Sequence, residues 1–185
     1  MTPFDILVLT AANEAQAKGY REQLVWRRDA GLLDPATRFE VVADPGGRRV
    51  GSLGATLNVL ERLRGTLAEV DSPAGAQNVF EGRRILICHS GGDSRRTPAY
   101  AAQGKVFTPV PTAAADNLPL ALFDLILKNL QKLPAPAGGH VLVTSGDVLL
   151  TFDHESVDLS RPGVTGVAYF GPAERGSRHG VYVPE

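Results

Sequence analysis

Short apolar runs rich in β-branched residues alternate along this chain with stretches in which leucines recur every three or four positions. The runs are typical of buried strands, and the leucine spacing is typical of amphipathic helices. Strands are predicted at 4–10, 38–43, 84–88, 140–144 and 164–170, and another is predicted to start within 179–183. Strands that alternate with helices predict an α/β fold with three layers, a mostly parallel sheet between helices.

Three helices are predicted between these strands. The first follows Asn13, a suitable N-cap, and places Ala17, Tyr20 and Leu24 on one face before Gly31 ends it. The second carries Leu57, Leu60, Leu63 and Leu67. The third is predicted to be capped by Asp116 or Asn117 and to bury Leu118, Leu122, Leu125, Leu130 and Leu133. Residues 71–82 are predicted to be an exposed connector, and prolines predict an extended 106–112.

The third strand runs directly into Ser90-Gly91-Gly92. Glycines let backbone N–H groups approach a phosphate closely, and Arg96 and Lys105 in the following loop add the positive charge that anionic oxygens need. The competing interpretation is a plain turn, with Arg96 a solvated charge and Lys105 exposed. The combination of strand, glycines and cations favours a phosphate site.

Two further stretches carry candidate chemistry. The glycine-containing run 46–56 leads into the second helix, where N–H dipoles can bind an anion; a turn capped by Ser52 or Thr56 is the alternative. Asp147, at the end of the fourth strand, is a candidate Mg²⁺ ligand, and an Asx-type cap is its alternative. Ligands bind beyond the carboxyl ends of parallel strands, so Gly91 and Asp147 are expected to face one crevice.

Composition narrows the classes of protein. A chain of 185 residues with 43% hydrophobic content is one domain or part of one, and a net charge of −1 argues against nucleic acid as a partner. No apolar run approaches the ~18 residues of a membrane span. The lone Cys88 cannot form an internal disulfide, which favours a reducing, cytoplasmic setting.

Four segments resemble the L-fucose-1-phosphate guanylyltransferase (GDP-fucose pyrophosphorylase) family, in which the enzyme stands alone or is fused to fucokinase. They are 5–12, 44–57, 89–111 and 145–148, and the resemblance covers nearly the whole chain in order. The central segment is also similar to the signature of sugar-1-phosphate nucleotidyltransferases, except that Ser94 and Thr97 replace a glycine and a hydrophobic residue. In the second segment Leu53 and Ala55 take the places of glycines.

The resemblance implies a Rossmann-like, GT-A-like nucleotidyltransferase fold and the transfer of GMP from GTP to L-fucose 1-phosphate, with Mg²⁺. It implies that Arg96 holds the triphosphate, that Lys105 lies near the α-phosphate or the leaving group, and that His179 lies near the sugar. The implied nucleotide-binding residues are Gly51, Ser52, Gly54, Thr56, Ser90, Gly91, Gly92 and Ser94. A pyrophosphorylase for another sugar 1-phosphate and a non-catalytic nucleotide-binding domain remain open; a P-loop kinase does not, because its motif is missing.

Family members that resemble this chain are much longer. Residues 1–185 are therefore expected to be a nucleotidyltransferase domain that is incomplete on its C-terminal side, with a kinase domain possible beyond it. We expect such a chain to bind nucleotide weakly and to make almost no nucleotide sugar alone, because a half-site cannot align the sugar phosphate.

Overall fold

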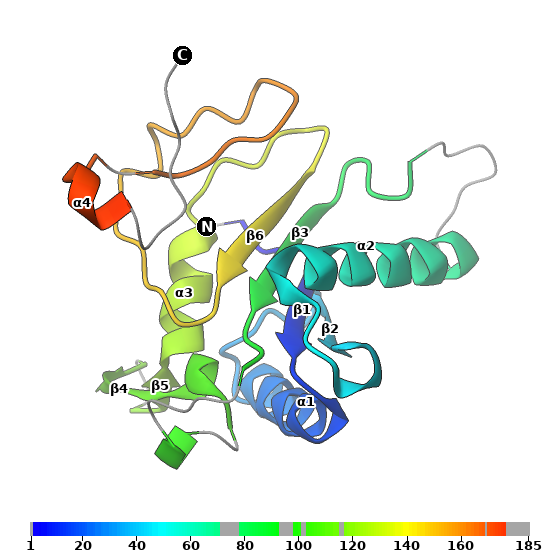
Figure 1. Ribbon diagram of the computed structural model, residues 1–185, viewed down its shortest axis with the longest axis vertical. Coiled ribbons are helices and arrows are strands. Elements are labelled where there is room, and N and C mark those ends of the chain that lie inside the picture. The colour runs from blue at the N-terminus through cyan, green and yellow to red at the C-terminus, as the bar shows by residue number, and fades with distance from the viewer. Residues whose placement is uncertain are drawn as a thin grey trace.

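The computed structural model describes residues 2–70, 78–92, 98–100, 103–114, 117–168 and 170–176. Its centre is a four-stranded sheet in the order β2-β1-β3-β6, in which each neighbouring pair is parallel. The strands are β1 (Ile6–Ala11), β2 (Arg38–Ala43), β3 (Arg84–His89) and β6 (His140–Ser145). Because they are parallel, their carboxyl ends gather at one edge of the sheet (Figure 1).

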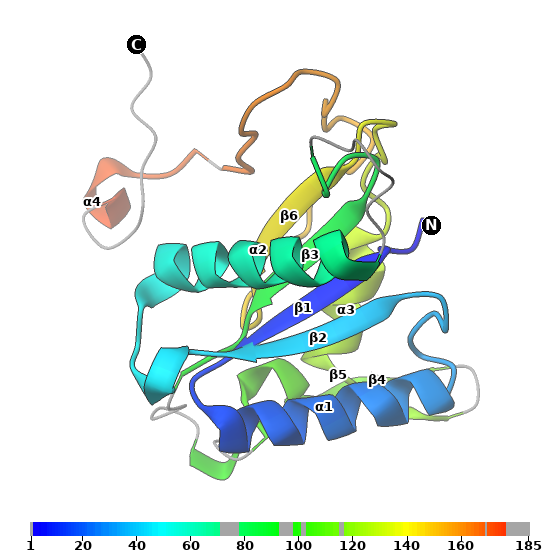
Figure 2. The ribbon, with the colours of Figure 1, turned by 90° about the vertical axis from the view of Figure 1, so that its right-hand side faces the viewer.

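Helices cover both faces of this sheet and complete three layers. The long helices are α1 (Glu14–Asp29) and α3 (Leu122–Leu130), which pack on one face, and α2 (Gly51–Val70), which packs on the other. Figure 2 shows α1 and α2 on opposite sides of the strands. The α/β fold with a mostly parallel sheet is confirmed. None of the described helices is long and apolar enough to cross a membrane.

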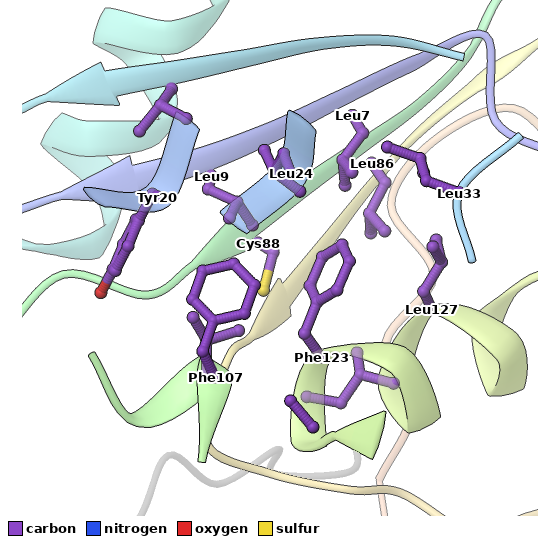
Figure 3. Close-up of a cluster of buried hydrophobic side chains, with 14 of the residues drawn as sticks. Leu7, Leu9, Tyr20, Leu24, Leu33, Leu86, Cys88, Phe107, Phe123 and Leu127 are labelled. Atoms are coloured by element: carbon purple, nitrogen blue, oxygen red, sulfur yellow. The ribbon is translucent and has the colours of Figure 1, made fainter. Parts of the chain in front are cut away.

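The face under α1 and α3 holds the larger of two apolar cores (Figure 3). Its labelled members come from the sheet, from both helices, from the connection between α1 and β2, and from the turn η3 (Lys105–Phe107): Leu7, Leu9, Tyr20, Leu24, Leu33, Leu86, Cys88, Phe107, Phe123 and Leu127. Each large apolar side chain buried in this way contributes about 1.5–3 kcal/mol to folding. The sheet edge is therefore supported by a rigid body on this side.

The first helix forms as the sequence predicts. Asn13 is extended, and its side chain accepts a hydrogen bond from the Gln16 amide at 2.9 Å. Arg27 and Arg28 lie in the last turn, where they complement the helix dipole, and Gly31 follows with a φ of +73°. Tyr20 is fully buried on the face that the periodicity assigned to the core.

The third helix begins later than predicted. A hairpin of β4 (Pro109–Ala113) and β5 (Pro119–Ala121) precedes it, and Asn117 lies in the hairpin turn with a φ of +57°. The N-cap is Ala121, whose amide donates to Asp124 at 2.7 Å; Asp116 lies outside the described residues. The strand pairing of 119–121 overrides the leucine spacing, so Leu118 is not helical and Leu125 is only half-buried. The buried stripe is Phe123, Ile126, Leu127 and Leu130.

The glycine run 46–56 is shorter as a loop than predicted. After the turn η1 (Pro45–Gly47), α2 already begins at Gly51, so Gly54 and Thr56 are helical. Leu53 and Ala55 are good helix formers in place of glycines, which explains the early start. Likewise Val106, predicted to be extended, lies in η3, and a further turn, η2 (Pro98–Tyr100), precedes it.

The C-terminal third differs most from the sequence prediction. β6 is a strand but is not buried, because it is the edge strand of the described sheet and α2 leaves its Val141 and Val143 exposed. The strand predicted at 164–170 is absent from its described residues, where Val164 and Phe170 are fully exposed. This segment runs outside the sheet to the short α4 (Ala173–Gly176), and no strand in the described part of the chain pairs with it (Figure 1). The strand expected within 179–183 lies outside the described residues.

Candidate functional site

Three strand ends meet at the carboxyl edge of the sheet. The turn after β6 is tied to the end of β3, since the Gly146 amide donates to the His89 carbonyl at 2.8 Å. A Cβ added at Gly146 would lie 3.1 Å from the Cβ of Ser90. The turn that carries Asp147 and the loop that carries Gly91 are therefore neighbours, as predicted from the parallel topology.

The loop Ser90–Gly92 is held by hydrogen bonds from two elements. The Ser90 amide donates to Thr10 Oγ1 at 3.3 Å and its hydroxyl donates to the Thr10 carbonyl at 2.8 Å. From α1, the Tyr20 hydroxyl donates to the Ser90 carbonyl at 2.8 Å, and Gln16 Nε2 donates to the Gly92 carbonyl at 3.4 Å. These contacts leave the loop little freedom to move when a ligand binds.

Close approach of two backbones leaves little room for a side chain at the first glycine. A Cβ at Gly91 would lie 3.3 Å from the carbonyl carbon of Ala11 and from the amide nitrogen of Ala12. Gly92 has a φ of +139°, which side-chain-bearing residues rarely adopt. Such glycine-rich backbone against a strand end can present N–H groups to anionic oxygens.

His89 links this loop to α2. Its Nδ1 lies 3.4 Å from Thr10 Oγ1 and its Nε2 lies 2.9 Å from Thr56 Oγ1. Thr56 donates its own proton to the Ser52 carbonyl at 3.0 Å, so it can only accept from Nε2–H. The hydrogen bonds thus assign the neutral tautomer protonated at Nε2. Burial lowers the pKa of His89, opposed by the Asp44 charge, and this favours the same neutral form.

Asp147 makes a half-exposed polar group with Ser145 and Lys105. The Ser145 hydroxyl donates to Oδ1 at 2.6 Å, and Lys105 Nζ lies 3.4 Å from Oδ2. The Ser145 hydrogen bond is the main cause that lowers the pKa of Asp147, followed by the contact with Lys105 and opposed by burial. The carboxylate is therefore ionised at neutral pH, beside a cation and an anchored glycine loop.

Of the residues predicted for the site, the structure gathers Ser90, Gly91, Gly92, Lys105 and Asp147 at this edge, and Ser52 and Thr56 join them through His89. Gly51 and Gly54 lie in the first turn of α2 and make no described contact with the loop. Ser94, Arg96 and His179 lie outside the described residues.

Sequence reasoning did not identify Thr10, Gln16, Tyr20 and Arg49 as site residues. Arg49 precedes α2 and reaches the Ser90–Gly92 loop, since its Nη2 lies 3.5 Å from a Cβ built on Gly92. Burial raises the pKa of the neighbouring Asp44, and the charges of Arg49 and His89 oppose that change. One feature of the sequence could have pointed to Tyr20. Its hydroxyl lies on the predicted buried face of the helix, and a buried hydroxyl needs a hydrogen-bond partner.

A family model described as the fucose pyrophosphorylase domain matches residues 77–185, more than half of the chain. The chain belongs to the fucose pyrophosphorylase family. The family resemblance in the sequence is thereby confirmed.

Curated members of the family match nearly all of the chain. The bifunctional fucokinase/GDP-fucose pyrophosphorylase of Arabidopsis thaliana is 32% identical over 97% of this chain and 19% of its own length. The fucose-1-phosphate guanylyltransferases of Mus musculus and Homo sapiens are each 31% identical over 97% of this chain, and over 29% and 28% of their own lengths. The chain thus spans less than a third of these relatives. No solved structure matches it significantly.

Proposed function

We propose that the protein transfers GMP from GTP to L-fucose 1-phosphate, giving GDP-L-fucose and pyrophosphate. The observation that carries the proposal is the match to two proteins named fucose-1-phosphate guanylyltransferase over 97% of this chain. The sheet edge supports it, because an anchored glycine loop, a lysine and a carboxylate lie together there.

The transfer needs little covalent chemistry from the protein. An oxygen of the sugar phosphate attacks the α-phosphorus of the triphosphate in line, and pyrophosphate leaves with the electron pair of the broken P–O bond. In our proposal Ser90–Gly92 presents its backbone to the triphosphate, and Lys105 neutralises charge near the α-phosphate. Arg96 adds a second positive charge and His179 contacts the sugar; both assignments rest on the family pattern alone.

Asp147 fits a Mg²⁺ ion that is completed by the substrate. The described residues contain no group of three metal-binding side chains, but Mg²⁺ is commonly held by one or two carboxylates together with water and phosphate oxygens. Asp147 is ionised, half-exposed and beside the glycine loop, so its Oδ2 could exchange Lys105 for the metal. When bound, the ion would neutralise charge on the phosphate oxygens.

The names of two relatives extend the proposal. The relative from Arabidopsis thaliana and one from Bacteroides fragilis, which is 30% identical over 80% of this chain, both carry fucokinase in their names. We therefore include a sugar kinase, fused or separate, as the source of the sugar 1-phosphate. We place the reaction in a reducing compartment such as the cytoplasm, because the one cysteine, Cys88, is a buried free thiol.

The test is a matrix of the four nucleoside triphosphates against sugar 1-phosphates, with and without Mg²⁺, read by pyrophosphate release and product mass. We expect GTP with L-fucose 1-phosphate and Mg²⁺ to give the fastest release. Faster turnover of another pair would replace the sugar or base assignment. Nucleotide binding by calorimetry without turnover, in a protein as long as the guanylyltransferase relatives, would instead support a non-catalytic nucleotide-binding domain.

A further inference from the structure

The buried phenol of Tyr20 contacts both the Ser90–Gly92 loop and the turn that carries Lys105. Tyr20 lies on α1, is fully buried, and donates its hydroxyl to the Ser90 carbonyl at 2.8 Å. Burial raises the pKa of this phenol, so it stays protonated and remains a donor. In Figure 3 the Tyr20 ring lies at one side of the cluster, and its oxygen points away from Leu9 and Leu24. Ser90 is the residue before the two loop glycines, so this bond fixes where the loop starts.

The other side of the same phenol faces the turn of Lys105. Gly104, with a φ of +71°, directly precedes this turn, and its carbonyl accepts from the Phe107 amide at 3.2 Å. A Cβ on Gly104 would lie 1.9 Å from the Tyr20 hydroxyl oxygen and 2.6 Å from two ring carbons. The backbone of the lysine turn therefore rests directly on the phenol.

The last residue of η3, Phe107, also packs against Tyr20. The ring of Phe107 meets the Tyr20 ring edge-on, with centroids 5.4 Å apart. The Arg27 guanidinium lies 4.6 Å from the Phe107 centroid and forms a buried ion pair with Asp124 at 2.7 Å. Both ends of η3 are thus in contact with a rigid part of the core.

We propose that Tyr20 is a positioning residue that sets the distance between the Ser90–Gly92 loop and Lys105. The inference rests on the proposed function, in which that loop and that lysine act on one triphosphate. The phenol touches no substrate itself; it spaces two segments that do. Such spacing affects the transition state more than ground-state binding, because a displacement of about 1 Å at a charged group can cost roughly a hundredfold in rate.

The first test is Tyr20→Phe, which keeps the ring and removes only the hydroxyl. We expect kcat to fall roughly ten- to a hundredfold while KM for the triphosphate changes less than about threefold. A residue with a structural role alone would lower the melting temperature and leave kcat of the folded protein unchanged. A kcat within twofold of the parent protein would overturn the proposal.

The second test approaches the same contact from Gly104. Gly104→Ala forces a Cβ onto the phenol, whereas the matched control Gly31→Ala has nearly the same φ, +73°, and no atom within 4 Å of its Cβ. We expect a loss of kcat in the first and not in the second. In the double variant Tyr20→Phe/Gly104→Ala the losses should be less than multiplicative, because both disturb one spacing. Multiplicative losses would contradict a shared origin.

Amide hydrogen exchange separates this inference from the proposed function. If a protein as long as the guanylyltransferase relatives turns over no pair of substrates, the proposed function fails, but amide exchange in Tyr20→Phe can still be measured. The spacer role predicts faster exchange at both the Ser90 and the Phe107 amides, which bond to Thr10 Oγ1 and to the Gly104 carbonyl. Faster exchange at Ser90 alone, or at neither amide, would refute it.

Discussion

Two glycine-containing stretches border the carboxyl edge of the sheet, and they use glycine for different reasons. In Ser90–Gly92 the glycine at 91 is favoured by contact, because a Cβ there would press on the backbone at the end of β1. In the stretch 45–51 the glycines at 46 and 51 have φ values of +60° and +72° and nothing within 4 Å of a built Cβ. The first stretch is anchored to the body of the protein. The second, called the open stretch below, has space around Gly46 and Gly51.

This difference indicates which stretch can be pre-organised for catalysis. Groups that stabilise developing charge are most effective when they do not have to reorganise, and Ser90–Gly92 is held by bonds from β1 and α1. The open stretch can instead adjust around a ligand. His89 connects them, since it bonds Thr10 beside one stretch and Thr56 in the helix that follows the other.

The largest expected effect is on turnover, from the cation beside the anchored loop. Lys105→Gln should lower kcat by about 10²–10³, because one positioned charge stabiliser is lost. Its stability should change little, since the pair with Asp147 is substantially exposed. Arg48→Gln, in the open stretch, is the matched control, and steady-state kinetics on both variants make the test. Equal losses would remove the distinction between the two stretches.

The next largest expected effect is on the free energy of unfolding, when a glycine is replaced by alanine. Gly91→Ala should lower the free energy of unfolding by about 1–3 kcal/mol, because backbone atoms 3.3 Å away have to move. Gly46→Ala meets no atom and should cost only about 1 kcal/mol for its positive φ. Urea unfolding measures both. If Gly46→Ala proves the more damaging, the assignment of anchored and open stretches is reversed.

A third comparison uses the two threonines that flank His89. Thr10→Val removes a buried hydroxyl and leaves the Ser90 amide and His89 Nδ1 without that partner, at a cost of about 1–3 kcal/mol. Thr56→Val removes a more exposed hydroxyl whose partners can reach water, and less than about 1 kcal/mol is expected. Thermal unfolding of the two variants, side by side, decides between them.

These contrasts also show what sequence reasoning can and cannot reach in this protein. The strand 84–88 and the loop after it were predictable, because a β-branched run followed by Ser-Gly-Gly carries local information. The parallel arrangement of the strands was enough to predict that Gly91 and Asp147 lie at the same edge of the sheet. Local signals alone therefore locate the candidate site.

The missed features depend on contacts between distant segments. Nothing near Tyr20 in the sequence indicates a bond to Ser90, seventy positions away. The start of α3 was misplaced because pairing of β4 with β5 outweighs leucine spacing at 118 and 122. The strand predicted at 164–170 had the right residue types, but among the described residues no neighbouring strand supplies it with hydrogen bonds.

A smaller effect is expected on metal dependence. Asp147→Asn keeps the shape of the side chain but offers Mg²⁺ a neutral, poorer ligand, so half-saturation should require roughly tenfold more Mg²⁺. Asp44→Asn, beside the open stretch, is the control and should leave the Mg²⁺ titration in place. An unchanged titration for Asp147→Asn would make that residue a structural cap.

The smallest expected effect is on the pH dependence of stability, and it tests the histidine between the two stretches. Burial lowers the pKa of His89 below the ordinary 6.5, while Asp44 opposes the shift. The unfolded chain then binds a proton at a pH where the folded protein does not, so stability is complete above about pH 6.5 and declines as the pH falls toward the folded pKa.

Burial and the charge of Arg84 lower the pKa of His140, which lies at the amino end of β6, so its titration changes stability in the same direction. Melting temperatures between pH 7.5 and 5.5 should therefore fall on acidification, and His89→Gln and His140→Gln should each flatten the slope. Acidification should also reduce the protection of the Ser90 amide against exchange, because protonated His89 can no longer accept from Thr10. Of the two variants, His89→Gln alone should abolish this loss of protection. A slope that His89→Gln leaves unchanged would show that the link between the anchored and open stretches does not depend on the neutral ring.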